Sequence, residues 1–269
     1  MGPEQTSPKG AVTQVSRPRL LAYRPAHPNG TAVVVIAGGG YVRIEAGKES
    51  TPACQWLQST GTSAFELIYR MPEDGWPPIA PFQDGQRAMR IVRSRAAAYG
   101  VDADRIGVIG FSAGGHLAGM TAVQPAAPLY RPVDAADAVS ARPDFAGLIY
   151  PVLTMMPPFD QTHSRREIVG PHPSTAESEA WSVERHVDAH TPPTFLAQAA
   201  DDPISPVDNS LLMFTALRAA HIPAELHIFQ SGEHGWGMGR PSTEVRAWPA
   251  LFAGWARYNG FLPPTAENG

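Results

Sequence analysis

The chain has 269 residues, of which 43% are hydrophobic and 17% charged, and its net charge is −4. This composition excludes a disordered chain, and the length suits one α/β domain spanning residues 1–269. The mild charge, without a block of Lys or Arg, argues against nucleic acid and anionic membranes as partners, and no apolar run approaches the ~20 residues of a membrane span.

The beginning of the chain is rich in proline and polar residues. Residues 1–19 are therefore predicted to be a flexible segment, followed by a short edge strand at residues 20–23. Residues 1–10 lack the apolar core of a signal peptide. The sequence thus predicts a soluble chain. It leaves open whether the protein is cytoplasmic, or is periplasmic or secreted with a signal peptide absent from this chain.

An apolar run without polar alternation at residues 31–36 predicts a central parallel strand covered on both faces. This strand leads directly into the sequence Ala37-Gly38-Gly39-Gly40-Tyr41. Three glycines at the carboxyl end of a buried strand let the backbone approach a ligand and turn its N–H groups toward it. An ordinary strand-to-loop turn is the alternative for so short a pattern.

Helical and strand patterns alternate along the rest of the chain. Helices are predicted at residues 49–60, 84–99, 112–123, 208–220 and 244–258, and strands at residues 63–69, 105–110, 145–150, 194–199 and 225–229. Pro249 is predicted to break the last helix near its middle, and Leu226, Ile228 and part of Phe229 to be buried on the last strand. The alternation predicts an α/β fold: a mostly parallel sheet, helices on both faces, and a site beyond the carboxyl ends of the strands.

Residues 151–191 show no strong periodicity. A segment of ~40 such residues inside a compact domain is typical of a cap or lid, so it is predicted to roof the site. Within it, His186 and His190 have the spacing of a metal pair, but they lack the His-Glu-x-x-His pattern and Pro192 follows at once. They are interpreted as surface histidines. The single cysteine, Cys54, excludes a disulfide within the chain and a cysteine-based zinc or iron–sulfur site, and no metal is predicted.

The stretch Gly110-Phe111-Ser112-Ala113-Gly114 lies between a predicted strand and a predicted helix. A Gly-x-Ser-x-Gly pattern in that context is typical of a nucleophile elbow. At so sharp a turn the serine takes a strained backbone conformation, and Cβ atoms on the flanking residues would collide with the strand or the helix. Ser112 is therefore the candidate nucleophile.

Three polar residues follow strand ends in the order Ser112, Asp202, His234, which is the order of the α/β-hydrolases. A serine hydroxyl is a weak nucleophile, so His234 is predicted to take its proton, and a carboxylate is needed to hold that histidine. Asp201 and Asp202 compete for this role. Asp202 is preferred because an Asp-x-x-x-Pro pattern leads from it into the next helix.

A tetrahedral oxyanion requires two or three preorganised donors. The N–H group of Ala113, directly after the nucleophile, is one candidate. The N–H groups of Gly39 and Gly40 are the others, because the loop after the corresponding strand supplies this half of the oxyanion hole in α/β-hydrolases.

These motifs together give a family resemblance. From about Leu20 to Gly260 the chain resembles the small carbohydrate acetylesterases of the α/β-hydrolase superfamily, often labelled xylanase-like or acetyl xylan esterase. The motifs that carry it are Ala37 to Tyr41, Tyr69-Arg70, Gly110 to Ala118, Asp201-Asp202-Pro203 and Glu233 to Gly237. The resemblance implies hydrolysis of acetyl esters on xylan fragments or other acetylated sugars, by a serine acyl-enzyme without a cofactor. Ala37 departs from the pattern, since related lipases have His there and this esterase group usually has Pro.

Two other functions are compatible with the sequence: a carboxylesterase or lactonase acting on small non-sugar esters, and a catalytically silent hydrolase fold that binds a ligand. Tyr41, Trp76 and Trp236 are candidate substrate-binding residues, because aromatic faces pack on the apolar faces of sugars. For the two tryptophans, core packing is the alternative. Acyl chain length, sugar identity and oligomeric state are not predicted.

Overall fold

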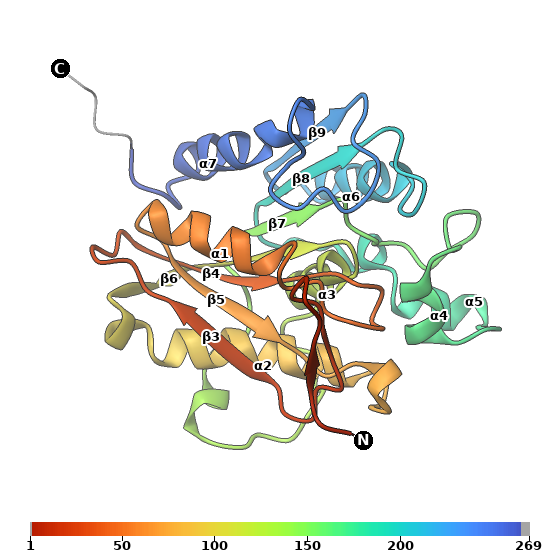
Figure 1. The fold of residues 1–269 in the computed structure, drawn as a ribbon, viewed down its shortest axis with the longest axis horizontal. Coiled ribbons are helices and arrows are strands. Elements are labelled where there is room, and N and C mark those ends of the chain that lie inside the picture. Colours follow the sequence, from red (N-terminus) through yellow and green to blue (C-terminus); the bar gives the residue numbers. More distant parts are fainter. Residues whose placement is uncertain (1, 265–269) are drawn as a thin grey trace.

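The computed structural model describes residues 2–264, and its centre is a twisted sheet of seven strands (Figure 1). Their order across the sheet is β3-β5-β4-β6-β7-β8-β9, and only β3 runs antiparallel to its neighbour. The strands are β3 (Arg19–Tyr23), β4 (Gly30–Ile36), β5 (Ser63–Ile68), β6 (Val101–Phe111), β7 (Ala146–Ile149), β8 (Thr194–Ala199) and β9 (Ala224–Phe229). The predicted mostly parallel sheet is confirmed, with each strand close to its expected place.

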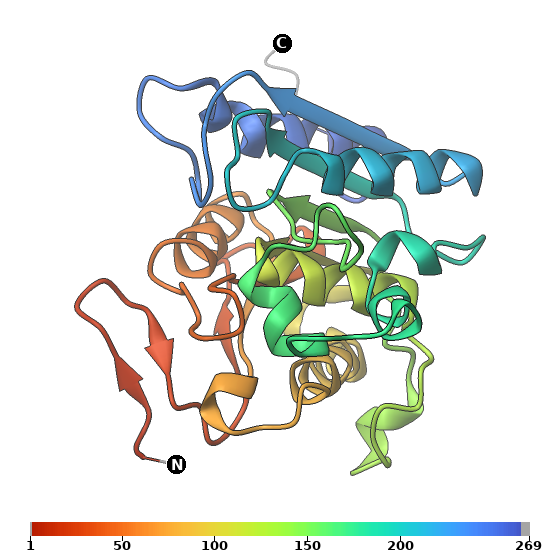
Figure 2. The same cartoon turned by 90° about the vertical axis from the view of Figure 1, so that its right-hand side faces the viewer.

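Helices cover both faces of this sheet (Figures 1 and 2). One face carries α1 (Ser50–Ser59) and α7 (Trp248–Tyr258), and the other carries α2 (Ala80–Ser94), α3 (Ala113–Val123) and α6 (Asp208–Ala219). Alternate residues of β4 serve the two cores, because Val33 and Val35 belong to the first and Val34 and Ile36 to the second. The strand is apolar throughout because both of its faces are covered.

Two helices differ from the sequence prediction at a proline. Helix α2 begins at Ala80, four residues before the predicted start, and Pro81 lies in its first turn. Pro249 likewise lies in the first turn of α7, after a separate 3-10 turn at Glu244–Ala247, and so does not break a helix near its middle. The first turn tolerates proline because its N–H groups have no partner within the helix.

The last strand is less buried than predicted. Ile228 is 43% exposed, whereas Phe229 is buried. Strand β9 is the edge of the sheet, with a neighbour on one side only, so the prediction that Ile228 is buried was wrong.

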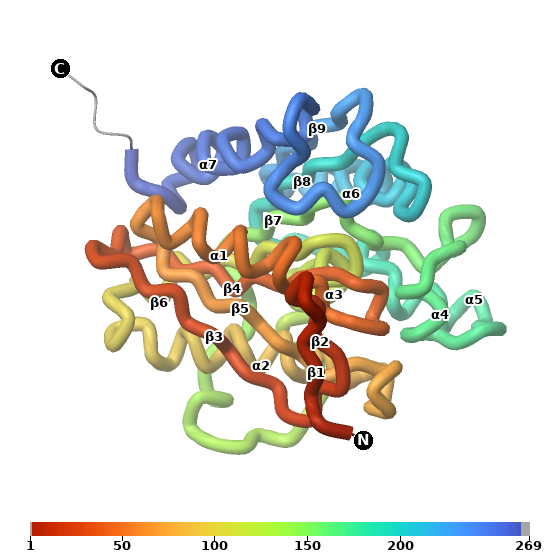
Figure 3. The backbone as a smooth tube through the Cα atoms, viewed as in Figure 1, coloured from red at the N-terminus to blue at the C-terminus, as the bar shows by residue number. Residues whose placement is uncertain are grey.

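A short hairpin precedes the sheet (Figure 3). Its strands, β1 (Gln5–Thr6) and β2 (Val12–Thr13), pair antiparallel, and Val12 also forms a bridge with Ile44. Strands of two residues leave no periodicity in a sequence, which is why none was predicted there. The predicted flexibility of residues 1–19 concerns motion and stays a prediction.

The cap segment, residues 151–191, contains two short helices, α4 (His163–Val169) and α5 (Thr175–Ala180), and a 3-10 turn at Val183–His186. The helices lie at the carboxyl edge of the sheet, beside α3 (Figure 1). Within residues 2–264, no helix has both the length and the apolar character needed to cross a membrane.

Candidate active site

Ser112 lies at the turn between β6 and α3 in a strained backbone conformation, with φ 51° and ψ −117°. The two flanking glycines make this turn possible. A Cβ at Gly110 would lie 2.1 Å from the carbonyl oxygen of Gly114, and a Cβ at Gly114 would lie 2.3 Å from that of Ile36. Both distances are far below van der Waals contact, so the steric reason for the Gly-x-Ser-x-Gly pattern holds in the structure.

The three residues predicted as a triad are brought together by different strand ends. Oγ of Ser112 lies 2.8 Å from Nε2 of His234, and Nδ1 of His234 lies 2.7 Å from Oδ2 of Asp202. A carboxylate accepts but does not donate, so Nδ1 carries the proton and Nε2 is left to accept the serine O–H. This tautomer suits a histidine that takes a proton from serine.

The side chain of Asp202 is held in place by hydrogen bonds. This side chain is fully buried. Its Oδ1 accepts hydrogen bonds from the N–H groups of Ile204 and Ser205. Its Oδ2 accepts hydrogen bonds from Nε2 of Gln198 and Nδ1 of His234. These four hydrogen bonds fix the orientation of the Asp202 side chain beside His234.

The neighbouring Asp201 does not reach the histidine ring. Its Oδ1 accepts the N–H groups of Gly232, at 2.9 Å, and Glu233, at 2.8 Å. Asp202, and not Asp201, is therefore the carboxylate that is hydrogen-bonded to His234. Asp201 instead forms hydrogen bonds to the loop that carries His234, a contact that the sequence did not predict.

The glycine loop after β4 is held by hydrogen bonds on its outer side. The carbonyl oxygen of Gly38 accepts the N–H of Glu45, and that of Gly39 accepts the N–H groups of Val42 and Arg43. Because each peptide unit is planar and trans, the N–H of the following residue points the opposite way. Gly39 and Gly40 both line the pocket above Ser112, and their role as donors to an oxyanion stays a prediction.

The pocket at this site has a volume of about 430 Å³. Thr162, His163 and Ser164 of the segment 151–191 line one wall of this pocket, and the prediction that the segment is a cap stays a prediction. A Cβ at Gly40 would lie 3.1 Å from Cβ of His163, so the cap lies directly against the glycine loop. The rest of the lining is Gly39, Gly40, Val42, Arg43, Glu45, Lys48, Glu49, Ser112, Val152, Ile204, His234 and Gly235.

The three aromatic residues predicted to bind substrate do not line this pocket, and that prediction was wrong. Tyr41 and Trp236 are buried in the two cores, at 0% and 3% exposure. Trp76 is half-buried against the segment before β3, where its Nε1 donates to the carbonyl oxygen of Val15. An aromatic residue beside a functional loop is often part of the support beneath it, and spacing alone does not separate the two cases.

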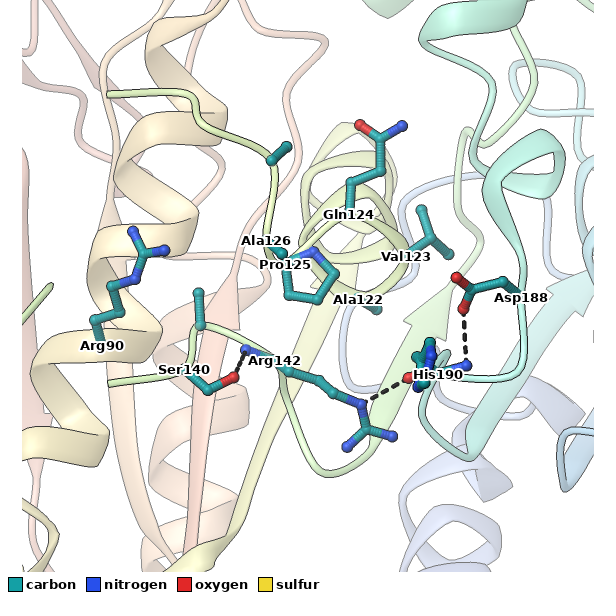
Figure 4. A pocket seen from close by; sticks show the side chains of 12 residues that line it. Arg90, Ala122, Val123, Gln124, Pro125, Ala126, Ser140, Arg142, Asp188 and His190 are labelled. Carbon is teal, nitrogen blue, oxygen red and sulfur yellow. Dashed lines mark hydrogen bonds between the residues drawn. The ribbon is translucent and has the colours of Figure 1, made fainter. Parts of the chain in front are cut away.

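A larger cavity, of about 590 Å³, lies near the far end of α3 (Figure 4). Residues 122–127 line one side of it, and Arg90, Arg142 and His190 are on the others. Because α3 is 11 residues long, this cavity lies roughly 16 Å along the helix from the nucleophile elbow, at 1.5 Å per residue. It has no part in the Ser112 site. Across residues 2–264, no group of three or more His, Cys, Asp or Glu side chains is placed to hold a metal ion.

Two residues for which the sequence predicts no role lie beside the catalytic residues: Glu49, which is part of the pocket lining, and Tyr150 behind it. Glu49 is 2% exposed and contacts both Gly38 and Tyr150, and Tyr150 packs edge-on against the ring of His234. Burial raises the pKa of Glu49, an effect opposed by its hydrogen bonds from Gly38 and Tyr150. Neither residue belongs to a recognisable motif. The only signal in the sequence is their position next to a helix start and a strand end.

A parallel sheet between two helical layers, with Ser, His and Asp joined by hydrogen bonds at its carboxyl edge, defines an α/β-hydrolase. Within that class, residues 22–217 match the BD-FAE family, and the chain belongs to this family.

Similar proteins agree with this assignment. The acetylxylan esterase of Xylanibacter ruminicola is 30% identical over 225 residues, which are 82% of this chain and 44% of that protein. The chain therefore spans less than half the length of this curated relative. The structure of an acetyl ester-xyloside bifunctional hydrolase from Caldicellulosiruptor lactoaceticus is 37% identical, with a TM-score of 0.83 and coverage of 91% of this chain and 89% of that one. A propionate-bound esterase of Thermogutta terrifontis is 27% identical, with a TM-score of 0.79 and coverage of 96% and 92%. The chain is therefore similar, over most of its own length, to proteins named as ester hydrolases.

Proposed function

We propose that this protein is a serine esterase that removes short acyl groups, acetyl in particular, from xylo-oligosaccharides or other acetylated sugars. The observation that carries the proposal is the hydrogen-bonded chain from Ser112 through His234 to Asp202, in a pocket that Gly39 and Gly40 also line. A catalytically silent relative would be expected to have lost at least one of these parts.

In the first half of the reaction, Oγ of Ser112 bonds to the carbonyl carbon of the ester while its proton passes to Nε2 of His234. The carbonyl oxygen takes the electron pair and is stabilised by the N–H groups of Gly39, Gly40 and Ala113. The bond to the alcohol oxygen then breaks. The alcohol leaves with the proton from Nε2, and the acyl group stays on Oγ.

The second half repeats these steps with water. His234 takes a proton from the water, whose oxygen bonds to the acyl carbon, and the same three N–H groups stabilise the new oxyanion. When the bond to Oγ breaks, the proton returns to the serine and the carboxylic acid leaves. Throughout both halves, Asp202 holds the ring and stabilises its charged form.

The sugar preference is supported by the relatives and by the rim of the pocket. Two of the similar proteins carry acetylxylan esterase and acetyl ester-xyloside hydrolase as their names. Hydroxyl-bearing and charged side chains from the cap and the glycine loop line the pocket here, including Thr162, Ser164 and Arg43. Such a rim suits a leaving group rich in hydroxyls better than an apolar one.

The test is a comparison of wild type with Ser112→Ala. The wild type should show burst release of alcohol from a short acyl ester, release acetate from acetylated xylo-oligosaccharides, and be labelled once by an organophosphonate on Ser112. The variant should lose all three. Ser94→Ala is the matched control, because Ser94 is an exposed serine at the end of α2. Wild-type hydrolysis by Ser112→Ala would overturn the proposal.

A second candidate is an esterase or lactonase for small non-sugar substrates, favoured by the similarity to the propionate-bound Thermogutta esterase. The ratio of kcat/KM for acetylated xylo-oligosaccharide to that for a simple butyryl ester separates the two. A higher value for the sugar supports the first function, and a higher value for the butyryl ester supports the second.

A further inference from the structure

A buried carboxylate joins the two loops that form the site. Glu49, directly before α1, is 2% exposed. Its Oε2 accepts the N–H of Gly38 at 2.6 Å, and its Oε1 accepts the O–H of Tyr150 at 2.8 Å. Gly38 is the first glycine of the oxyanion loop, residues 37–41. A Cβ there would lie 2.7 Å from Cβ of Ser112, so this loop contacts the nucleophile directly.

Tyr150 continues the connection to the histidine loop, residues 231–237. Its hydroxyl oxygen accepts the N–H of Gly237 at 3.0 Å, and its ring lies 5.1 Å from that of His234. Three successive hydrogen bonds thus run from Gly38 through Glu49 and Tyr150 to Gly237. They link the donors for the oxyanion to the base.

Each oxygen of the Glu49 carboxyl group accepts one hydrogen bond. The N–H of Gly38 donates to one oxygen, and the hydroxyl of Tyr150, which accepts the N–H of Gly237, donates its own hydrogen to the other. Both carboxylate oxygens therefore act as acceptors. A buried carboxyl group that accepts two hydrogen bonds is held firmly in place, because the loss of either bond would leave a buried polar group without a partner.

The oxyanion loop needs this anchor at one particular peptide. The carbonyl oxygen of Ala37 accepts the hydroxyl of Tyr69 at 2.9 Å, and the N–H of Gly38 in the same peptide unit donates to Glu49. The plane of that peptide is thereby fixed from both sides. The next peptide, which carries the N–H of Gly39, is joined directly to this fixed peptide, so its position is restricted as well.

We propose, resting on the esterase function proposed above, that Glu49 is a positioning residue that holds the oxyanion loop and the histidine loop in one fixed arrangement around Ser112. It does not touch the substrate's reacting atoms. Its effect on the rate comes through the N–H groups of Gly39 and Gly40 on one side, and through the place of His234 on the other.

Substitution by glutamine separates this role from simple packing. The amide keeps the size of the side chain and one acceptor for Gly38, but its NH₂ group then faces Tyr150, whose O–H loses its acceptor. Because misplacement of catalytic groups by about 1 Å can cost on the order of 100-fold, Glu49→Gln should lower kcat by about 10- to 100-fold with KM changed by less than about threefold. Tyr150→Phe breaks the same chain at its second link and should lower kcat in the same way.

A matched control comes from a second buried glutamate. Glu66 on β5 is 1% exposed and accepts hydroxyl groups from Tyr23, Ser50 and Thr51, and it does not line the pocket. Glu66→Gln should therefore lower Tm to a similar degree while leaving kcat per active site unchanged.

The experiment measures kcat, KM and Tm for Glu49→Gln, Tyr150→Phe, their double variant and Glu66→Gln, using a short acetyl ester. Titration with an organophosphonate counts the active sites, so that kcat refers to folded enzyme only. The expected result is a fall in kcat for the first two variants, and a fall for the double variant smaller than the product of the two, because both break one chain.

The proposal is overturned if Glu49→Gln keeps kcat within about twofold of wild type, or if Glu66→Gln loses as much kcat as Glu49→Gln. Should Glu49→Gln not fold, wild-type kcat in Tyr150→Phe overturns it as well. Loss of activity in Ser112→Ala beside unchanged kcat in these variants would reject only the role of Glu49. Activity that survives in Ser112→Ala would reject the esterase mechanism itself.

Discussion

The hydroxyl of Tyr41 lies 2.9 Å from Nδ1 of His116, inside the core and beneath the glycine loop. On the other side of the imidazole, Nε2 lies 2.7 Å from the carbonyl oxygen of Trp181 in the cap. A carbonyl can only accept, so Nε2 carries the proton and Nδ1 accepts the tyrosine O–H. One neutral histidine on α3 therefore joins the oxyanion loop to the cap.

This histidine should make stability depend on pH. Burial lowers the pKa of His116 to about 4, an effect partly opposed by its hydrogen bond to Trp181. The unfolded chain, with an ordinary histidine pKa near 6.5, binds a proton at pH 5 that the folded protein does not, so stability falls as the pH falls below about 6.5. The contribution between pH 7 and pH 5 is about 2 kcal/mol. Urea unfolding at the two pH values measures it.

The matched variants are His116→Gln and His190→Gln. The first removes the buried imidazole. It should lower the unfolding free energy at pH 7, and it should reduce the further fall in unfolding free energy between pH 7 and pH 5. The second changes an exposed histidine and should leave the pH dependence as in wild type. Equal pH dependence in wild type and His116→Gln would contradict the assignment to His116.

The two adjacent aspartates should differ sharply in their effect on activity. Asp202→Asn presents an amide to His234 and favours the wrong tautomer, so kcat should fall by about 10³- to 10⁴-fold. Asp201→Asn keeps an oxygen that accepts the N–H groups of Gly232 and Glu233. Its kcat should therefore fall by less than about tenfold, as expected for one weakened hydrogen bond. Steady-state kinetics at saturating ester compare them. A larger loss in Asp201→Asn would exchange their roles.

The sequence predicts the parts of the site that its local chemistry requires. Ser112, Asp202 and His234 follow strand ends with glycine and proline patterns around them, and parallel strands bring such ends to one edge of a sheet. The sequence does not reveal the roles of Glu49 and Tyr41, because those roles depend on how deeply the two side chains are buried. A glutamate before a helix is usually solvated, and an aromatic residue after three glycines has no periodicity that tells the core from the pocket.

The steric demand at the elbow gives a paired prediction about stability. In Gly114→Ala the new Cβ would lie 2.3 Å and 2.5 Å from the carbonyl oxygens of Ile36 and Ala37, so the variant should lose about 3 kcal/mol of unfolding free energy or more. Gly254→Ala in α7 meets open space and should gain about 0.5–1 kcal/mol, since alanine favours a helix over glycine. Urea denaturation compares both with wild type, and equal effects would contradict the steric account.

The cap should affect sugars more than simple esters. His163 is exposed at the wall of the pocket, opposite Gly40, where a bound leaving group would pass between the cap and the glycine loop. Loss of one polar contact costs about 0.5–1.5 kcal/mol, so His163→Ala should raise KM for acetylated xylo-oligosaccharide by about 2- to 10-fold. A small aryl acetate does not extend to the cap, and its KM should stay unchanged. His172→Ala changes another exposed cap histidine, outside the pocket lining, and should leave both values as in wild type. An equal rise for sugar and aryl acetate in His163→Ala would place the cap's effect on the acyl side of the site instead of the leaving-group side.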